Sequence, residues 1–261
     1  MNIQQQFADS AVKILEQDNQ VLGLAAAGSW ITNELDKFSD LDLVVVTKEK
    51  IGGDKEKMLQ LAGRLGTLLS GFTGEHVGEP RVLICLYDNP LLHVDIKFVT
   101  TQEFEHRIEN PIILLDKQGL LKEIMEHTMP VYPYSDYQWL EDRFWTWVHY
   151  ALLKIGRGEY MEAFDFFSYL RMTVFGPLFH IKNGNLPRGV RKVETQLSPD
   201  DFDNLFKTVP DYSREGLLKA LEHSVVVYRR LRQDLFRDIR QQGLTEEKVM
   251  EYFAEIANQR K

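Results

Sequence analysis

The sequence predicts an α/β domain followed by a helical domain. Apolar residues that alternate in strand fashion are concentrated in the first hundred residues. After Thr100 the strand patterns almost vanish, and apolar residues recur at helical spacing instead. Pro130 and Pro133 fall close together between the two halves. We therefore expect two domains, residues 1–132 and residues 133–261.

The first hundred residues contain two helix patterns and four strand patterns. Apolar side chains at helical spacing predict helices over residues 3–17 and Asp54–Leu69. Runs rich in β-branched residues predict strands at Val21–Ala27, Leu41–Val46, Val82–Tyr87 and Leu92–Thr100. The last two are separated by Asp88-Asn89-Pro90, residue types that favour a turn.

The second half is expected to form long helices separated at glycines and prolines. The predicted helices are Tyr137–Ile155, Tyr160–Lys182, Arg214–Arg240 and Thr245–Asn258. An aromatic-rich stretch begins this half. Most of its members are expected to belong to the hydrophobic core, and the alternative is that they line an acceptor pocket. They are Tyr132, Tyr134, Tyr137, Trp139, Phe144, Trp145, Trp147 and Tyr150.

Composition narrows the class of protein. With 261 residues, 44% of them hydrophobic, the chain can bury one large core or two smaller ones. The net charge of -8 is the reverse of the basic footprint of proteins that bind nucleic acid, so no nucleic-acid partner is expected. The single cysteine, Cys85, lies in an apolar run, where a buried, inert thiol is expected. No signal peptide and no membrane span are apparent, which predicts a cytoplasmic protein without a membrane partner.

Two acidic residues at the start of the second predicted strand carry the chemical signal. Alternation along Asp40-Leu41-Asp42-Leu43 sends Asp40 and Asp42 to one face, with their Cα atoms about 6.6 Å apart at about 3.3 Å per residue. Like charges this close repel and raise each other's pKa, so the pair calls for a counter-charge. Mg²⁺ would supply it, and two such ions about 3.5–4 Å apart can promote in-line displacement at phosphorus.

A third carboxylate is available on a later strand. In His93-Val94-Asp95-Ile96-Lys97, alternation places His93, Asp95 and Lys97 on one face. Asp95 is therefore a candidate metal ligand, a candidate acceptor of the attacking group's proton, or both.

Gly28-Ser29, at the end of the first predicted strand, suits a turn that binds phosphate. A glycine lets phosphate approach the backbone N–H groups closely, and the Ser29 hydroxyl adds a further donor. Taken singly, Asp-x-Asp is typical of a solvated strand end, Gly-Ser of an ordinary turn, and Asp95 of a surface position. Their occurrence together, in this order and beside apolar strands, favours a nucleotide site.

These motifs resemble a known superfamily. Gly28-Ser29 followed by Asp40-x-Asp42 is similar to the signature of the polymerase β nucleotidyltransferases, and Phe38–Val46 resembles their antibiotic-modifying branch. His93–Phe98, Leu114–Lys122 and the stretch from Phe144 to Arg171 resemble the aminoglycoside 6-adenylyltransferases, which inactivate streptomycin.

The resemblance implies a catalytic domain with a mixed sheet in residues 1–132 and a helical bundle that binds substrate in residues 133–261. It implies an enzyme that uses Mg²⁺ and ATP. By this likeness Asp40, Asp42 and Asp95 are the metal and catalytic carboxylates, and Gly28 and Ser29 bind the triphosphate. The family further implies that a glutamate of the helical half, such as Glu159 or Glu162, is an alternative base.

One residue departs from the family pattern. Many relatives have arginine directly after Gly-Ser, whereas this chain has Trp30, which cannot neutralise phosphate. Lys37, Lys97 or an arginine of the helical half would then have to serve.

Three functions remain open at this point. The chain transfers a nucleotide to a small hydroxylated acceptor such as an aminoglycoside, it nucleotidylates a protein in regulation or a toxin–antitoxin pair, or it senses nucleotide without turnover.

Overall fold

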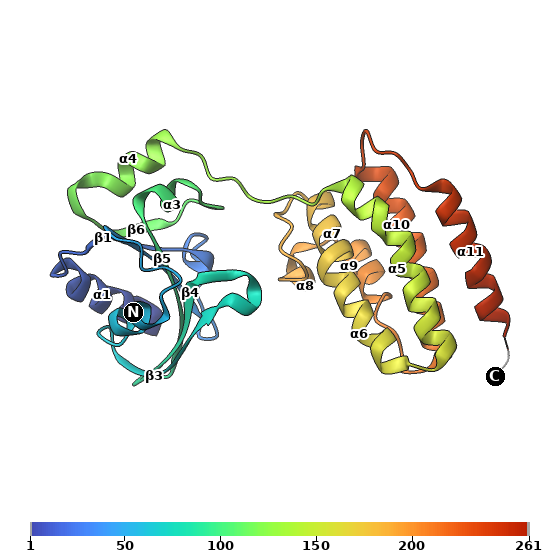
Figure 1. Ribbon diagram of the computed structural model, residues 1–261, viewed down its shortest axis with the longest axis horizontal. Coiled ribbons are helices and arrows are strands. Elements are labelled where there is room, and N and C mark those ends of the chain that lie inside the picture. Colours follow the sequence, from blue (N-terminus) through green and yellow to red (C-terminus); the bar gives the residue numbers. More distant parts are fainter. Residues whose placement is uncertain (1, 260–261) are drawn as a thin grey trace. The chain divides into compact units, whose positions relative to one another are not determined.

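The chain folds into two compact units that divide between Tyr132 and Pro133 (Figure 1). The structure is a computed structural model that describes residues 2–259. Each unit has its own hydrophobic core, built from residues of that unit alone. The α/β fold of the first part and the helical fold of the second confirm the predicted fold class.

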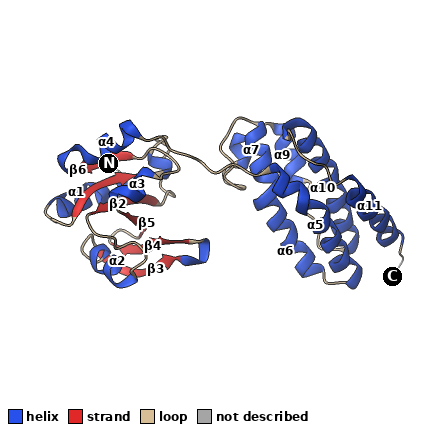
Figure 2. Cartoon of the chain, turned by 45° about the horizontal axis from the view of Figure 1, so that its top comes forward, coloured by secondary structure: helices blue, strands red, loops and turns tan. Residues whose placement is uncertain are grey.

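The first unit is built on a mixed six-stranded sheet (Figure 2). Its strands are β1 (Val21–Ala26), β2 (Leu41–Thr47), β3 (Thr67–Gly74), β4 (Glu79–Asp88), β5 (Leu92–Val99) and β6 (Ile112–Asp116). Their order across the sheet is β3-β4-β5-β2-β1-β6. Strands β2 and β5 run parallel, and the other four neighbouring pairs run antiparallel. This parallel pair at the centre of the sheet carries Asp42 and Asp95, and Asp40 directly precedes β2.

Helices cover both faces of this sheet. The helices of the unit are α1 (Ile3–Glu16), α2 (Lys55–Ala62), α3 (Thr101–Glu105) and α4 (Leu120–His127), with short 3-10 turns at Gly28–Trp30, Glu75–Val77 and Lys117–Gly119. The main core joins α1 and α2 to the sheet through side chains such as Leu15, Met58 and Leu43. A smaller cluster beneath α3 and α4 contains Phe104 and Leu121. On each face of the sheet, apolar side chains therefore pack against helices over part of the length of the strands.

Two sequence predictions were wrong at the edges of this sheet. The helix expected over Asp54–Leu69 ends at Ala62, and the chain from Thr67 onward forms edge strand β3. Strand β6 lies at the other edge, beyond Thr100, where no strand was expected. Both edge strands are only partly buried, so their apolar patterns are weak. Leu68 and Leu69 of β3 also continue the helical spacing of Leu61 and Leu65 before them.

The second unit is entirely helical in its described residues. Its helices are α5 (Tyr137–Arg157), α6 (Tyr160–Leu170), α7 (Gly176–Lys182), α8 (Val193–Gln196), α9 (Pro199–Phe206), α10 (Arg214–Leu235) and α11 (Gly243–Asn258). A π-helical segment, Arg171–Phe175, joins α6 to α7. The expected long helix over residues 160–182 thus forms with a change of pitch inside it, and α10 ends five residues before the expected Arg240. Phe144 and Trp145 lie at the centre of the core, where both are fully buried.

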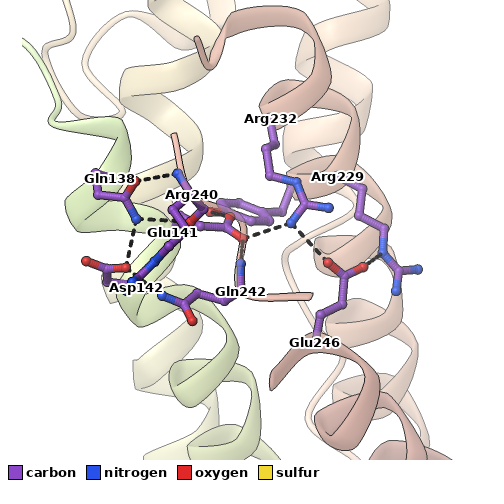
Figure 3. Close-up of polar contacts among 9 residues, drawn as sticks. Gln138, Glu141, Asp142, Arg229, Arg232, Arg240, Gln242 and Glu246 are labelled. Atoms are coloured by element: carbon purple, nitrogen blue, oxygen red, sulfur yellow. Dashed lines mark hydrogen bonds and ion pairs between the residues drawn. The ribbon is translucent and has the colours of Figure 1, made fainter. Parts of the chain in front are cut away.

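A buried polar network joins three segments of the helical unit (Figure 3). The Glu141 carboxylate is 1% exposed. It accepts hydrogen bonds from the Tyr228 hydroxyl at 2.7 Å, from Arg232 at 3.0 Å and from the backbone N–H of Gln242 at 2.9 Å. Arg232 also contacts Glu246 at 3.0 Å, which links α10 to α11. A buried charge with so many partners is costly to disturb.

The single cysteine is inert in this fold. Cys85 is buried in β4, and burial raises the pKa of its thiol to about 12. The thiol therefore stays protonated and unreactive at neutral pH. Over the described residues, no helix combines the length and apolar character that a membrane span requires.

We predict that Glu141→Gln will lower the free energy of unfolding of the helical unit by about 1.5–3 kcal/mol, because the amide removes the buried charge that Arg232 and the Tyr228 hydroxyl contact and leaves Arg232 with Glu246 alone. Urea unfolding followed by tryptophan fluorescence measures this, since Trp139, Trp145 and Trp147 all lie in that unit. Glu247→Gln, an equal charge change at an exposed position of α11, is the control. A Glu141→Gln variant as stable as this control would show that the network does not stabilise the unit.

Candidate active site

The parallel register of β2 and β5 sets Asp42 directly beside Asp95. Their Cα atoms are partners in the ladder, so both side chains leave the same face of the sheet on strands about 4.8 Å apart. On the other face the neighbouring partners Leu41 and Val94 are buried in the main core. Asp42 and Asp95 themselves are only partly buried. The core thus fixes which way the two carboxylates point, and both remain within reach of solvent.

Asp40 immediately precedes β2, at the end of a loop that α1 holds in place. The buried side chain of Gln4 donates to the carbonyl oxygens of Asp36 at 3.0 Å and Ser39 at 2.7 Å. The loop also closes on itself, because the Asp36 carboxylate accepts from the backbone N–H of Phe38 at 2.8 Å. The polar loop before Asp40 is therefore anchored to the body of the unit.

The Gly28 turn lies against the Asp42 carboxylate. Gly28 has a φ of +59°, and a Cβ atom at this position would come within 2.0 Å of Asp42 Oδ2. The Ala27 N–H also donates to the Asp42 carbonyl at 2.9 Å, which ties the turn to β2. Only glycine has both the backbone freedom and the space required here. The structure therefore brings Gly28, Asp42 and Asp95 to one place on the sheet.

Trp30, the departure from the family pattern, has a structural role. Its partly buried side chain packs against the main core of the unit. Ser29 lies between Gly28 and Trp30 and is also partly buried. An indole in this position stabilises the turn by apolar contact and brings no charge to it.

The lysines proposed to replace the missing arginine already have partners. Lys97, two residues beyond Asp95, forms an ion pair with Glu79 at 2.9 Å. Glu79 also accepts two hydrogen bonds from Arg81, and Arg81 and Lys97 together lower the pKa of Glu79 to about 2. Lys37 lies over the ring of Phe38 at 4.7 Å, on the exposed loop. Lys97 is thus held by a fully ionised carboxylate beside the candidate site.

The carboxylates fit Mg²⁺ as part of a shared site. Their hard oxygen donors are those Mg²⁺ prefers, and Mg²⁺ is commonly held by one or two carboxylates together with substrate phosphates. Among residues 2–259, no three His, Cys, Asp or Glu side chains are arranged as a ready metal-binding group. The assignment of Asp40, Asp42 and Asp95 as ligands of Mg²⁺ stays a prediction.

Asp95 has a close neighbour on its own strand. His93 Nε2 lies 2.8 Å from Asp95 Oδ1, and the His93 side chain is 50% exposed. Alternation had placed both residues on one face, and the structure shows them in direct contact. The hydrogen bond orients the Asp95 carboxylate.

A residue outside the predicted set also reaches the turn. Glu109, in the segment between α3 and β6, accepts a hydrogen bond from the Gly28 N–H at 3.1 Å. The two residues are 81 positions apart in the sequence, and Glu109 lies in no recognisable motif. Only the fold reveals this contact.

The helical unit contains a row of aromatic side chains along α5 and α6. Its members are Trp139, Trp147, Tyr169, Phe166 and Tyr150, each with its ring 4.9–5.6 Å from the next. They are partly or well exposed, unlike Phe144 and Trp145 of the same stretch. The aromatic stretch therefore divides between core and surface.

Glu162, one of the two glutamates named as alternative bases, is poorly suited to that role. Glu162 accepts a hydrogen bond from the Tyr150 hydroxyl and forms an ion pair with Lys154 at 2.9 Å. These two contacts lower the pKa of Glu162, which makes its carboxylate a weaker proton acceptor. Glu159 is also held by Lys154 at 2.9 Å.

Comparison with known proteins identifies the first unit. Residues 8–128 match the family model of the nucleotidyltransferase domain, and this part of the chain is a polymerase β-like nucleotidyltransferase domain. No protein of curated function matches the sequence significantly.

Solved structures also match the chain at low sequence identity. An aminoglycoside 6-adenyltransferase from Bacillus subtilis is 16% identical, with a TM-score of 0.41, and the match covers 99% of this chain and 100% of that one. A nucleotidyltransferase-like protein from Exiguobacterium sibiricum is 12% identical, with a TM-score of 0.35, over 95% and 78% of the two chains. The spectinomycin adenyltransferase AAD(9) from Enterococcus faecialis, solved with ATP and spectinomycin, is 13% identical, with a TM-score of 0.32, over 97% and 99%.

We predict that Gly28→Ala will weaken binding of Mg²⁺–ATP by at least about tenfold, because the new methyl group must displace the Asp42 carboxylate. Gly78→Ala is the matched control, since Gly78 has a φ of +79° and nothing within 4 Å of its Cβ position. Both variants should lose about 1–2 kcal/mol of stability from the left-handed backbone. Calorimetry that finds equal affinity in the two variants would contradict the role given to the Gly28–Asp42 contact.

Proposed function

We propose that this chain, whose residues 8–128 form a nucleotidyltransferase domain, transfers a nucleoside monophosphate, AMP from ATP, to a hydroxyl group of a small acceptor. The observation that carries the proposal is the pairing of Asp42 with Asp95 across the parallel strands, with the Gly28 turn against Asp42. Carboxylates beside a glycine turn suit a metal-bound triphosphate.

The residues divide the chemistry between them. Gly28 and Ser29 bind the β- and γ-phosphates through backbone N–H groups and the Ser29 hydroxyl. Asp40, Asp42 and Asp95 would hold Mg²⁺, which supplies charge neutralisation on the phosphate oxygens when bound.

The acceptor oxygen forms a bond to the α-phosphorus while the bond from that phosphorus to the bridging oxygen of the β-phosphate breaks, and pyrophosphate leaves. Asp95 takes the proton of the acceptor hydroxyl, with His93 orienting its carboxylate. Positioning and electrostatics account for most of the rate.

The nature of the acceptor rests on the sequence motifs and on the aromatic row. The motifs around Asp95 and in the helical half resemble aminoglycoside 6-adenylyltransferases. The aromatic row offers exposed ring faces that attract ammonium groups, and Arg143 already lies 4.2 Å from the ring of Trp139. A hydroxylated, amine-bearing small molecule of the aminoglycoside class fits both features. We place this substrate-binding role in residues 133–261.

Purified protein with Mg²⁺ and labelled ATP should transfer label to an aminoglycoside and release pyrophosphate in equal amount. The screen should contain aminoglycosides, lincosamides and a cell lysate, with release of pyrophosphate measured in each. Label on a lysate protein, with none on the antibiotics, would assign a protein as the acceptor. ATP binding without pyrophosphate release under every condition would make the chain a nucleotide sensor and overturn the proposed transfer.

Asp42→Asn and Asp95→Asn should each lower the transfer rate by at least about a hundredfold, because an amide cannot replace the charge that a metal requires or accept the proton. Asp88→Asn, an equal charge change at the exposed last residue of β4, serves as the control. If Asp42→Asn kept full activity with Mg²⁺, the metal role of this residue would be wrong.

A further inference from the structure

The Glu109 carboxylate holds a backbone donor of the turn that we assign to the triphosphate. The Gly28 N–H donates to Glu109 Oε1 at 3.1 Å, and the Glu109 side chain is partly buried. Gly28 also lies against Asp42, so two carboxylates contact one glycine from different directions. A phosphate oxygen that binds this N–H must take the place of Glu109.

The segment that carries Glu109 is anchored through Arg107. Arg107 donates to the side chain of Asn110 at 2.7 Å and to the carbonyl oxygen of Thr128 at 2.6 Å. Its own carbonyl oxygen accepts from the Val131 N–H at 2.9 Å. These contacts tie residues 107–110 to the chain that follows α4. The approach of Glu109 to Gly28 is therefore a product of the fold around it.

The negative charge of Glu109 disfavours the binding of a nucleotide phosphate at the Gly28 N–H. A carboxylate and a phosphate seek the same donors, and both are anions, so they repel at short range and compete for one N–H. No arginine follows Ser29, and Lys97 is paired with Glu79. Without an arginine there, and with Lys97 bound to Glu79, little positive charge from these positions offsets the repulsion between Glu109 and an incoming triphosphate.

We propose that Glu109 is an autoinhibitory residue that occupies the triphosphate turn in the nucleotide-free protein. The inference rests on the proposed function, because it takes the Gly28 turn as the place where triphosphate binds. The Glu109 carboxylate satisfies the Gly28 N–H while the site lacks nucleotide, and it swings away when triphosphate enters. Glu109 thus lowers the affinity for ATP without taking part in the chemistry.

Two substitutions separate the hydrogen bond from the charge. Glu109→Gln keeps an oxygen that can accept from Gly28 but removes the negative charge. Glu109→Ala removes both. If the charge dominates, the two variants gain affinity alike, and if the hydrogen bond also matters, Glu109→Ala gains more.

The experiment measures binding of Mg²⁺–ATP and of inorganic tripolyphosphate to the full chain by calorimetry. Tripolyphosphate reports the phosphate turn without the base or sugar. Both Glu109 variants should bind each ligand roughly tenfold more tightly than the original chain. The gain should shrink as salt is raised, because screening weakens the repulsion. Glu105→Gln, an equal charge change at an exposed residue of α3, should bind as the original chain does.

The possible results are distinct. Affinity that stays unchanged or falls in both Glu109 variants, while the original chain binds Mg²⁺–ATP, would overturn the autoinhibitory role and leave the proposed function standing. An equal gain in Glu105→Gln would also overturn it, since the effect would then be one of net charge. Failure of the original chain and of every variant to bind either ligand would instead overturn the proposed function. Thermal unfolding of each variant verifies that the fold is retained.

Discussion

The parallel pairing of β2 with β5 is the constraint on which the candidate site depends. Where the two strands pair, one face is apolar and buried, with Leu41 and Val94 among its partners, so core packing fixes the register. A slip of one residue would turn Asp42 into the core and a leucine toward solvent. The same strand register is therefore required both for a stable hydrophobic core and for the placement of the carboxylates. The Gly28 turn depends on the same register, because it rests against Asp42.

Sequence patterns predicted the centre of this fold better than its edges. Around Asp42 and Asp95 the two central strands are buried on one face only, so the residues there alternate with a period of two, from which the faces of Asp42 and Asp95 followed. The edge strands β3 and β6 contribute fewer core residues. The start of β3 therefore fitted the pattern of a helix, and β6 lacked a pattern that predicts a strand. In the helical half the long helices were predicted well, because their apolar faces surround a single large core.

Some features of the candidate site follow from local sequence motifs, and others depend on contacts between residues far apart in the sequence. The motif residues Gly28, Ser29, Asp40, Asp42 and Asp95 are visible in the sequence because their spacing is local and their strands are regular. Their roles as ligands and catalysts remain predictions. Contacts made across the fold have no sequence signal. Neither the hold of Gln4 on the loop before Asp40 nor the approach of Glu109 to Gly28 could be inferred without the structure.

The buried cysteine gives this protein a practical property. Because Cys85 is the chain's single cysteine and burial keeps its thiol protonated, the original chain is already a background that reacts poorly with maleimides. A cysteine introduced at any exposed position would then be the one thiol open to a fluorophore or spin label. No cysteine has to be removed first, so the core around β4 stays intact. One label in each unit would report motions of the loops and of the two units in solution.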